Sequence, residues 1–121
     1  MVDERLAYCV LIVPAVSPID GQPTGLLLSR LMRNQGIGVA EMCGLLAVHN
    51  PLTYAPRLEG ERMLIIGGAG DRVTMPRHLR LLHQHWPGSA LHWFPRNHIL
   101  HLGRGEYLAC MGALMDRYSG L

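Results

Sequence analysis

The chain has 121 residues, of which 49% are hydrophobic and 17% are charged, and its formal net charge is +2. This size and composition predict one globular domain over residues 1–121, long enough to bury a core. The small net charge argues against a nucleic-acid partner and against binding to an anionic membrane surface.

The first half of the chain predicts one strand followed by two short helices. The apolar run 8–13 is rich in β-branched residues, which predicts a strand buried on both faces, as in a parallel sheet. A helix is predicted over 24–34. Its apolar face is formed by Leu27, Leu28 and Leu31. A second short helix follows, with apolar residues at helical spacing: Val39, Met42, Cys43 and Leu46.

The second half predicts two more strands, each followed by a helix. The strands are predicted at 63–66 and 90–94. The first of these helices starts with Pro76 in its first turn and ends near Trp86. Its buried face is predicted to be Leu79, Leu82 and Trp86. The last helix runs over about 104–118, with a predicted buried stripe of Leu108, Met111, Met115 and Tyr118. Strands that alternate with helices predict an α/β fold with a three-stranded parallel sheet and flanking helices.

Two polar side chains follow neighbouring strands of this predicted sheet. Asp71 comes after the second strand and its run of glycines, and His98 comes after the third strand. Because the carboxyl ends of parallel strands lie at one edge, we expect these two residues to meet. Asp71 would hold the imidazole in one tautomer, and His98 would act as general base and then general acid. The alternative is a turn aspartate and a loop histidine, each of them solvated.

The segments Gly68-Ala-Gly-Asp71-Arg-Val73-Thr-Met-Pro76 and Pro95-Arg-Asn-His98 resemble the C-terminal half of the α/β-hydrolase family. In that family the acid follows the penultimate strand, and the histidine follows the last strand. The resemblance implies that residues 17–57 occupy the place of the lid or cap insertion. It also implies a relationship to carboxylic-ester hydrolases, a small-molecule ester or acyl substrate, and no cofactor.

The nucleophile of that family is not found in this sequence. Its Gly-x-Ser-x-Gly elbow and first oxyanion loop would lie upstream of Met1. The serines present are Ser17, Ser29, Ser89 and Ser119, and none follows a strand on a glycine elbow. We therefore expect a chain that carries the Asp–His part of a triad and is nearly inactive alone. The alternatives are a non-catalytic binding or assembly module, and a subunit that complements a separate nucleophile-bearing half.

Other histidines and the glycine run offer weaker hypotheses. His101, three residues after His98, is the alternative functional histidine. His78 and His85 are expected to be partly buried surface residues, and the histidine spacings do not predict a metal site. The run 67–70 lacks the Gly-Lys-Ser/Thr ending of a phosphate-binding loop, so its glycines are predicted to let the chain turn tightly after the strand.

The cysteines and the N-terminus predict the compartment of the chain, and the edge of the first strand predicts its association state. Cys9 and Cys110 lie in apolar patterns and are expected to be buried free thiols, which suggests a reducing compartment. The N-terminus is acidic and the first apolar run is too short to span a bilayer, so we expect a cytoplasmic protein. An uncovered edge on the first strand predicts a homo-oligomer or a complex with a complementing N-terminal half.

Overall fold

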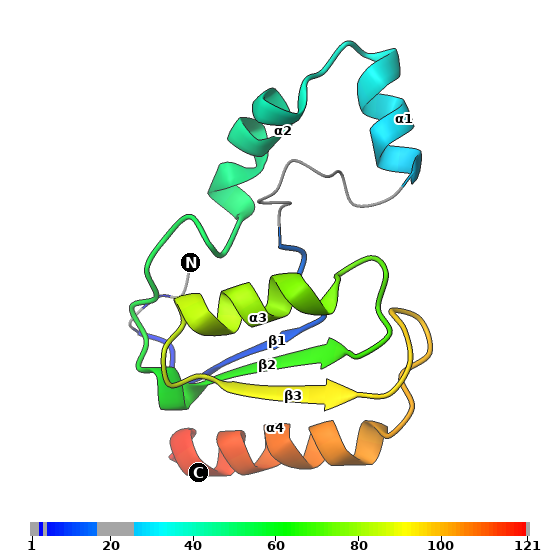
Figure 1. Ribbon diagram of the computed structural model, residues 1–121. Coiled ribbons are helices and arrows are strands. Elements are labelled where there is room, and N and C mark those ends of the chain that lie inside the picture. The colour runs from blue at the N-terminus through cyan, green and yellow to red at the C-terminus, as the bar shows by residue number, and fades with distance from the viewer. Residues whose placement is uncertain (1–2, 4, 17–25, 121) are drawn as a thin grey trace.

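The computed structural model describes residues 3, 5–16 and 26–120, and its centre is a three-stranded parallel sheet. The strands are β1 (Cys9–Ile12), β2 (Met63–Gly68) and β3 (Ala90–Phe94), in the spatial order β1–β2–β3 (Figure 1). β2 is longer than predicted because Gly67 and Gly68 still pair with Trp93 and Phe94. The predicted α/β fold class is confirmed.

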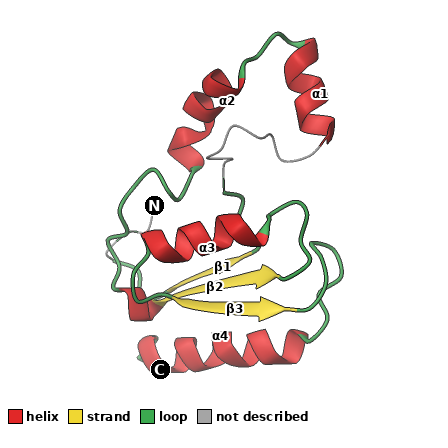
Figure 2. Ribbon diagram, viewed as in Figure 1, coloured by secondary structure: helices red, strands yellow, loops and turns green. Residues whose placement is uncertain are grey.

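Helices cover both faces of this sheet. α3 (Pro76–His85) lies on one face and α4 (Arg104–Tyr118) on the other, so that the sheet is the middle of three layers (Figure 2). α1 (Leu26–Asn34) and α2 (Val39–Leu46) stand apart from the sheet, beyond α3 in the view of Figure 1. Within the part of the chain described, no helix is both long and apolar enough to cross a membrane.

The segment 17–57 is described only in part. Its residues 17–25 lie outside the described residues, as do the side chains of Leu27, Leu28 and Val39. The remainder holds α1, α2 and a short 3₁₀ helix at Ala47–His49. The assignment of this segment as a lid or cap therefore stays a prediction.

The core is divided by the sheet into two clusters because side chains alternate along β2. One cluster, on the α3 side, joins Met63 and Ile65 of β2 to the residues predicted for the buried face of the helix, namely Leu79, Leu82 and Trp86. The other lies on the α4 side and consists of Leu64, Ile66, Phe94 and Tyr107. Every residue of β2 is buried, as expected for the central strand of a parallel sheet.

The buried stripe of α4 differs from the prediction by one residue. Leu108 and Met115 are 54% and 41% exposed, whereas Tyr107 is buried and Leu114 packs against the second cluster. Both sets of positions fit helical spacing, and one residue corresponds to a rotation of about 100°. The ring of Phe94, 5.8 Å from that of Tyr107, supplies the contact that fixes the rotation.

A similar shift occurs on α1. Leu31 is exposed, contrary to prediction, and the adjacent Met32 is buried. On α2, the predicted apolar residues Met42, Cys43 and Leu46 are half-buried. The short helices therefore follow the predicted apolar pattern less closely than α3 does.

Cys9 and Cys110 are free thiols, as predicted, but they are less buried than predicted. Cys110 is exposed on α4, with its Sγ 3.8 Å from Nδ1 of His92 on β3. Cys9 is half-buried, and this burial raises the pKa of its thiol. The expectation of two buried thiols is wrong for Cys110, whose side chain reaches His92 on β3 but stays open to solvent.

The glycines after Ile66 serve close packing as well as the predicted tight turn, which spans residues 68–71 and is closed by the N–H of Asp71 donating to the carbonyl of Gly68 at 3.1 Å. Gly67 and Gly68 belong to β2, and neither has a positive φ. A Cβ at Gly67 would overlap the side chain of Leu79 and lie 2.9 Å from the ring of Trp93. The missing side chain therefore lets α3 approach the sheet.

Gly67→Ala should lower the free energy of unfolding by about 1–3 kcal/mol, since the buried Leu79 side chain has no space into which to move. Denaturant unfolding measures this loss. Gly44→Ala is the matched control, because a Cβ on this α2 residue meets nothing within 4 Å. The control should be neutral or stabilising by up to about 1 kcal/mol. Equal stability of the two variants would contradict the packing role of Gly67.

The outer edge of β1 carries no partner strand among the described residues, and the predicted association stays a prediction. We expect light scattering at micromolar concentration to give at least twice the mass of one chain. Ile12→Lys should shift this mass toward the monomer, because Ile12 is exposed on the edge strand and a charge there opposes strand pairing. A stable, well-folded monomer of the unaltered chain would contradict the prediction.

Candidate functional site

The loops after β2 and β3 are joined by backbone hydrogen bonds beyond the ends of the strands. The N–H of Ala69 donates to the carbonyl of Phe94 at 3.0 Å, and the N–H of Gly70 donates to that of Arg96 at 2.9 Å. A Cβ at Gly68 would lie 3.0 Å from the same Arg96 oxygen. These bonds continue the β2–β3 pairing and bring Asp71 and His98 to one edge of the sheet.

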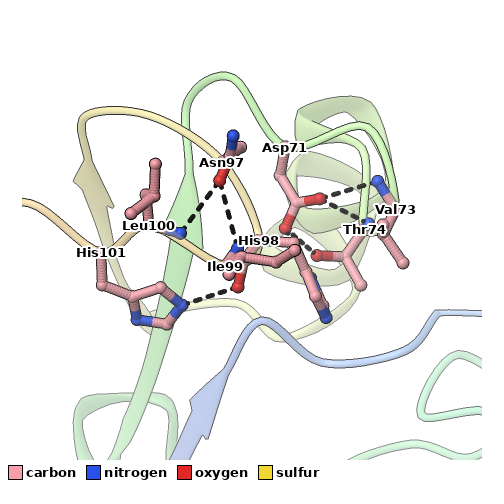
Figure 3. Close-up of polar contacts among 8 residues, drawn as sticks. All are labelled: Asp71, Val73, Thr74, Asn97, His98, Ile99, Leu100 and His101. Carbon is pink, nitrogen blue, oxygen red and sulfur yellow. Dashed lines mark hydrogen bonds and ion pairs between the residues drawn. The ribbon is translucent and has the colours of Figure 1, made fainter.

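Asp71 has a fully buried side chain that accepts four hydrogen bonds (Figure 3). Its Oδ1 accepts from the N–H groups of Val73 at 2.7 Å and Thr74 at 3.0 Å. Its Oδ2 accepts from Oγ1 of Thr74 at 2.7 Å and from Nδ1 of His98 at 2.9 Å. Burial by itself raises the pKa of Asp71, but these hydrogen bonds outweigh it and hold the pKa below its ordinary value.

His98 is placed with one ring nitrogen on Asp71 and the other directed away from it. Because the ionised carboxylate can only accept, Nδ1 carries the proton in this hydrogen bond. Nε2 of the neutral ring is then unprotonated and free to accept a proton. The His98 side chain is 36% exposed, so a molecule from solution can reach it. The structure thus brings together the two residues that the sequence singled out.

His101, the alternative functional histidine, does not contact Asp71. Its ring stacks on that of Phe94 at 4.4 Å, and its Nδ1 lies 3.4 Å from the hydroxyl of Tyr107. Its Nε2 lies 3.0 Å from the backbone oxygen of His98, to which it donates. This residue supports the loop that carries His98.

The sequence did not single out Thr74 and Asn97 as site residues. Thr74 positions Asp71, and Asn97 positions the turn that carries His98. Thr74 donates twice to Asp71, through its backbone and its hydroxyl. Oδ1 of Asn97 accepts from the N–H groups of Ile99 at 3.2 Å and Leu100 at 3.0 Å, which fixes the turn around His98. A threonine three residues after the acid and an asparagine before the histidine are signals of such turns.

An open cavity of about 610 Å³ lies beside His98. Residues of both loops line it: Gly70, Arg72, Val73, Arg96, Asn97, His98 and Ile99. A volume of this size is in the range of small-molecule sites.

The described serines lie away from His98. Ser89 is buried before β3, where its Oγ is 3.0 Å from Nδ1 of His83, and Ser119 follows the last turn of α4. Ser17 and the side chain of Ser29 lie outside the described residues. The described part of the chain therefore assigns no nucleophile to the Asp71–His98 pair.

The remaining histidines do not form a metal site in the described part of the chain, where no three potential ligands converge. His78 is fully buried within α3, so the expectation of partial burial is wrong for it. His85 is half-buried, and its Nε2 lies 2.9 Å from the backbone oxygen of Tyr54. The helix position of His78 faces the sheet, like that of Leu82 four residues on.

Comparison with family models and with curated proteins finds no match. Among solved structures, the chain is similar to a novel thermophilic esterase, Est2 of the Planctomycetes species Thermogutta terrifontis, with propionate bound. The identity is 19% and the TM-score is 0.40, over 89% of this chain and 39% of that chain. The chain thus spans well under half the length of the esterase. At this identity and TM-score, the similarity gives no information on activity.

Asp71→Asn should destabilise the protein by about 1–3 kcal/mol at neutral pH, since the amide nitrogen cannot accept from Thr74 and His98. Because the pKa of Asp71 is lowered on folding, its charge stabilises the protein fully above the ordinary value of 3.8. This contribution is lost as the pH falls through that value toward the lowered pKa. Denaturant unfolding across this acid range measures it. The variant should lose part of the pH dependence, and an unchanged profile would contradict the assignment.

Proposed function

We propose that Asp71 and His98 are the acid–base pair of a carboxylic-ester hydrolase of the α/β-hydrolase type. The observation that carries this proposal is the 2.9 Å contact between His98 Nδ1 and a fully buried carboxylate, from which we infer that Nδ1 carries the proton and Nε2 can accept one. The order of the two residues after neighbouring parallel strands, and the motifs around them, support the same assignment.

In this mechanism His98 moves the proton and Asp71 keeps its charge. Nε2 accepts the proton of an attacking hydroxyl group or water, and the imidazolium so formed is stabilised by the carboxylate of Asp71. His98 then returns the proton to the leaving alcohol oxygen. Positioned acid–base groups of this kind accelerate a reaction by about 10²–10⁴-fold.

The chain alone is proposed to be nearly inactive, because no hydroxyl or thiol of the described residues is assigned as the nucleophile of His98. Two alternatives follow from the same observation. A subunit of this kind could complement a separate half that supplies the nucleophile and the oxyanion donors. A non-catalytic binding or assembly module would retain the Asp71–His98 contact only as structure.

Hydrolysis of a p-nitrophenyl ester separates catalysis from structure. We expect a low rate for the unaltered chain and a rate at least about tenfold lower for His98→Ala, because the general base is removed. His49→Ala is the matched control, since His49 is an exposed histidine of the 3₁₀ helix after α2, and its rate should equal that of the unaltered chain. Equal rates for the unaltered chain and His98→Ala would overturn catalysis by this chain and favour the non-catalytic module.

Nitrogen-15 NMR of the histidine rings tests the same pair without turnover. The neutral form of His98 should carry its proton on Nδ1, and Asp71→Asn should change this tautomer preference because its amide can also donate. His49 should give the same spectrum in both proteins. A neutral His98 protonated on Nε2 in the unaltered chain would contradict the proposed role of Asp71.

A further inference from the structure

The cavity beside His98 is lined by two cationic side chains and no anionic one. Arg72 lines the cavity from the loop after β2, and Arg96 lines it from the loop after β3. The carboxylate next in sequence, that of Asp71, is buried and already accepts four hydrogen bonds. The cavity thus combines uncompensated positive charge in its lining with a volume that can hold a small molecule.

Neither of these guanidinium groups forms an ion pair with another described residue. Other arginines of the same chain do: Arg5 pairs with Asp3, and Arg62 pairs with Glu59 at 3.2 Å. A guanidinium group without a carboxylate partner retains its five donors for an external anion. Two such groups at one cavity favour binding of an oxyanion.

The backbone of Arg96 adds a second observation. This residue has a φ of +82°, a conformation that costs a side chain such as arginine about 1–2 kcal/mol and that glycine or asparagine adopts more readily. The strain lies in the wall of the cavity, one residue before Asn97. Strained residues of this kind concentrate at ligand-binding sites.

Two aliphatic residues of the lining are exposed. Val73 and Ile99 are 54% and 84% exposed, although both are branched aliphatic side chains. They line the same cavity as the two arginines. The ligand that fits such a lining has an anionic end and a short apolar portion.

We propose that this cavity binds small amphiphilic oxyanions, namely compounds that join a carboxylate or phosphate group to a short aliphatic chain. Arg72 and Arg96 take the anionic oxygens, and Val73 and Ile99 contact the aliphatic part. This inference rests on the proposed function in one respect. The substrate class that it names, an ester bearing a second, anionic group, would be held with its ester bond near Nε2 of His98.

Isothermal titration calorimetry at low salt tests binding with three probes that share one chain length: hexanoate, hexyl phosphate and hexanol. We expect the two anions to bind and hexanol to bind at least about tenfold more weakly, because it cannot accept charge-assisted hydrogen bonds. The relative affinity of hexanoate and hexyl phosphate tells which oxyanion the arginines prefer. Hexanol binding as tightly as both anions would overturn the proposal.

Two variants locate the site. Arg72→Gln and Arg96→Asn should each weaken anion binding about tenfold, as expected for the loss of one charge-assisted contact. Arg5→Gln, which removes one positive charge before β1 at the opposite end of the sheet, is the charge-matched control and should bind as the unaltered chain does. Equal weakening by Arg5→Gln would show a general charge effect and would overturn the site.

Arg96→Asn also separates binding from folding. Asparagine tolerates a positive φ, so this variant should unfold at the same or a higher denaturant concentration while its anion affinity falls. Loss of both stability and binding would assign Arg96 a structural role and overturn its role in the cavity. Because calorimetry needs no turnover, anion binding with equal ester hydrolysis by the unaltered chain and His98→Ala would refute the proposed function alone. Absence of anion binding with His98-dependent hydrolysis would refute this inference alone.

Discussion

The buried carboxylate of Asp71 is the group on which the candidate site depends. An isolated buried charge is strongly destabilising, so a carboxylate in this position requires donors on both of its oxygens. Thr74 and Val73 supply three of them from the segment that leads into α3, and His98 supplies the fourth from the loop after β3. The same hydrogen bonds that stabilise the charge therefore connect two crossover units of the sheet.

The parallel sheet explains why these two loops meet at all. β2 is paired on both sides, and its carboxyl end lies beside that of β3. The loops then continue the pairing, through the N–H groups of Ala69 and Gly70. At Gly68 and Gly70 a side chain would press on the carbonyl of Arg96 at 3.0 and 3.2 Å. The glycine run thus allows a close approach of two backbones in addition to the turn at 68–71 that the sequence predicts.

Much of this arrangement follows from the sequence, because buried strands and amphipathic helices leave strong periodic signals. These signals predict the strands and α3, and from the order of the strands they also predict the proximity of Asp71 to His98. The rotation of α4 could not be predicted in this way, since two apolar stripes fit its spacing and the choice of Tyr107 depends on its tertiary contacts, among them the ring of Phe94. Donors such as Thr74, and the positive φ of Arg96, depend on turn geometry that a period of hydrophobic residues does not encode.

The contact between Asp71 and His98 is positioned by the backbone around it. The carbonyl of Arg96 is held by Gly70, the turn after His98 is held by Asn97, and the carbonyl of His98 itself accepts from His101. None of these hydrogen bonds uses the imidazole of His98, so the loop does not need the ring in order to keep its shape. The backbone thus positions the loop, and the hydrogen bond to Asp71 positions the ring. An acid–base group that is preorganised in this way loses little conformational freedom when it accepts a proton. The strain at Arg96 is then a local cost of holding the loop against β2, in a position where its side chain also faces the cavity.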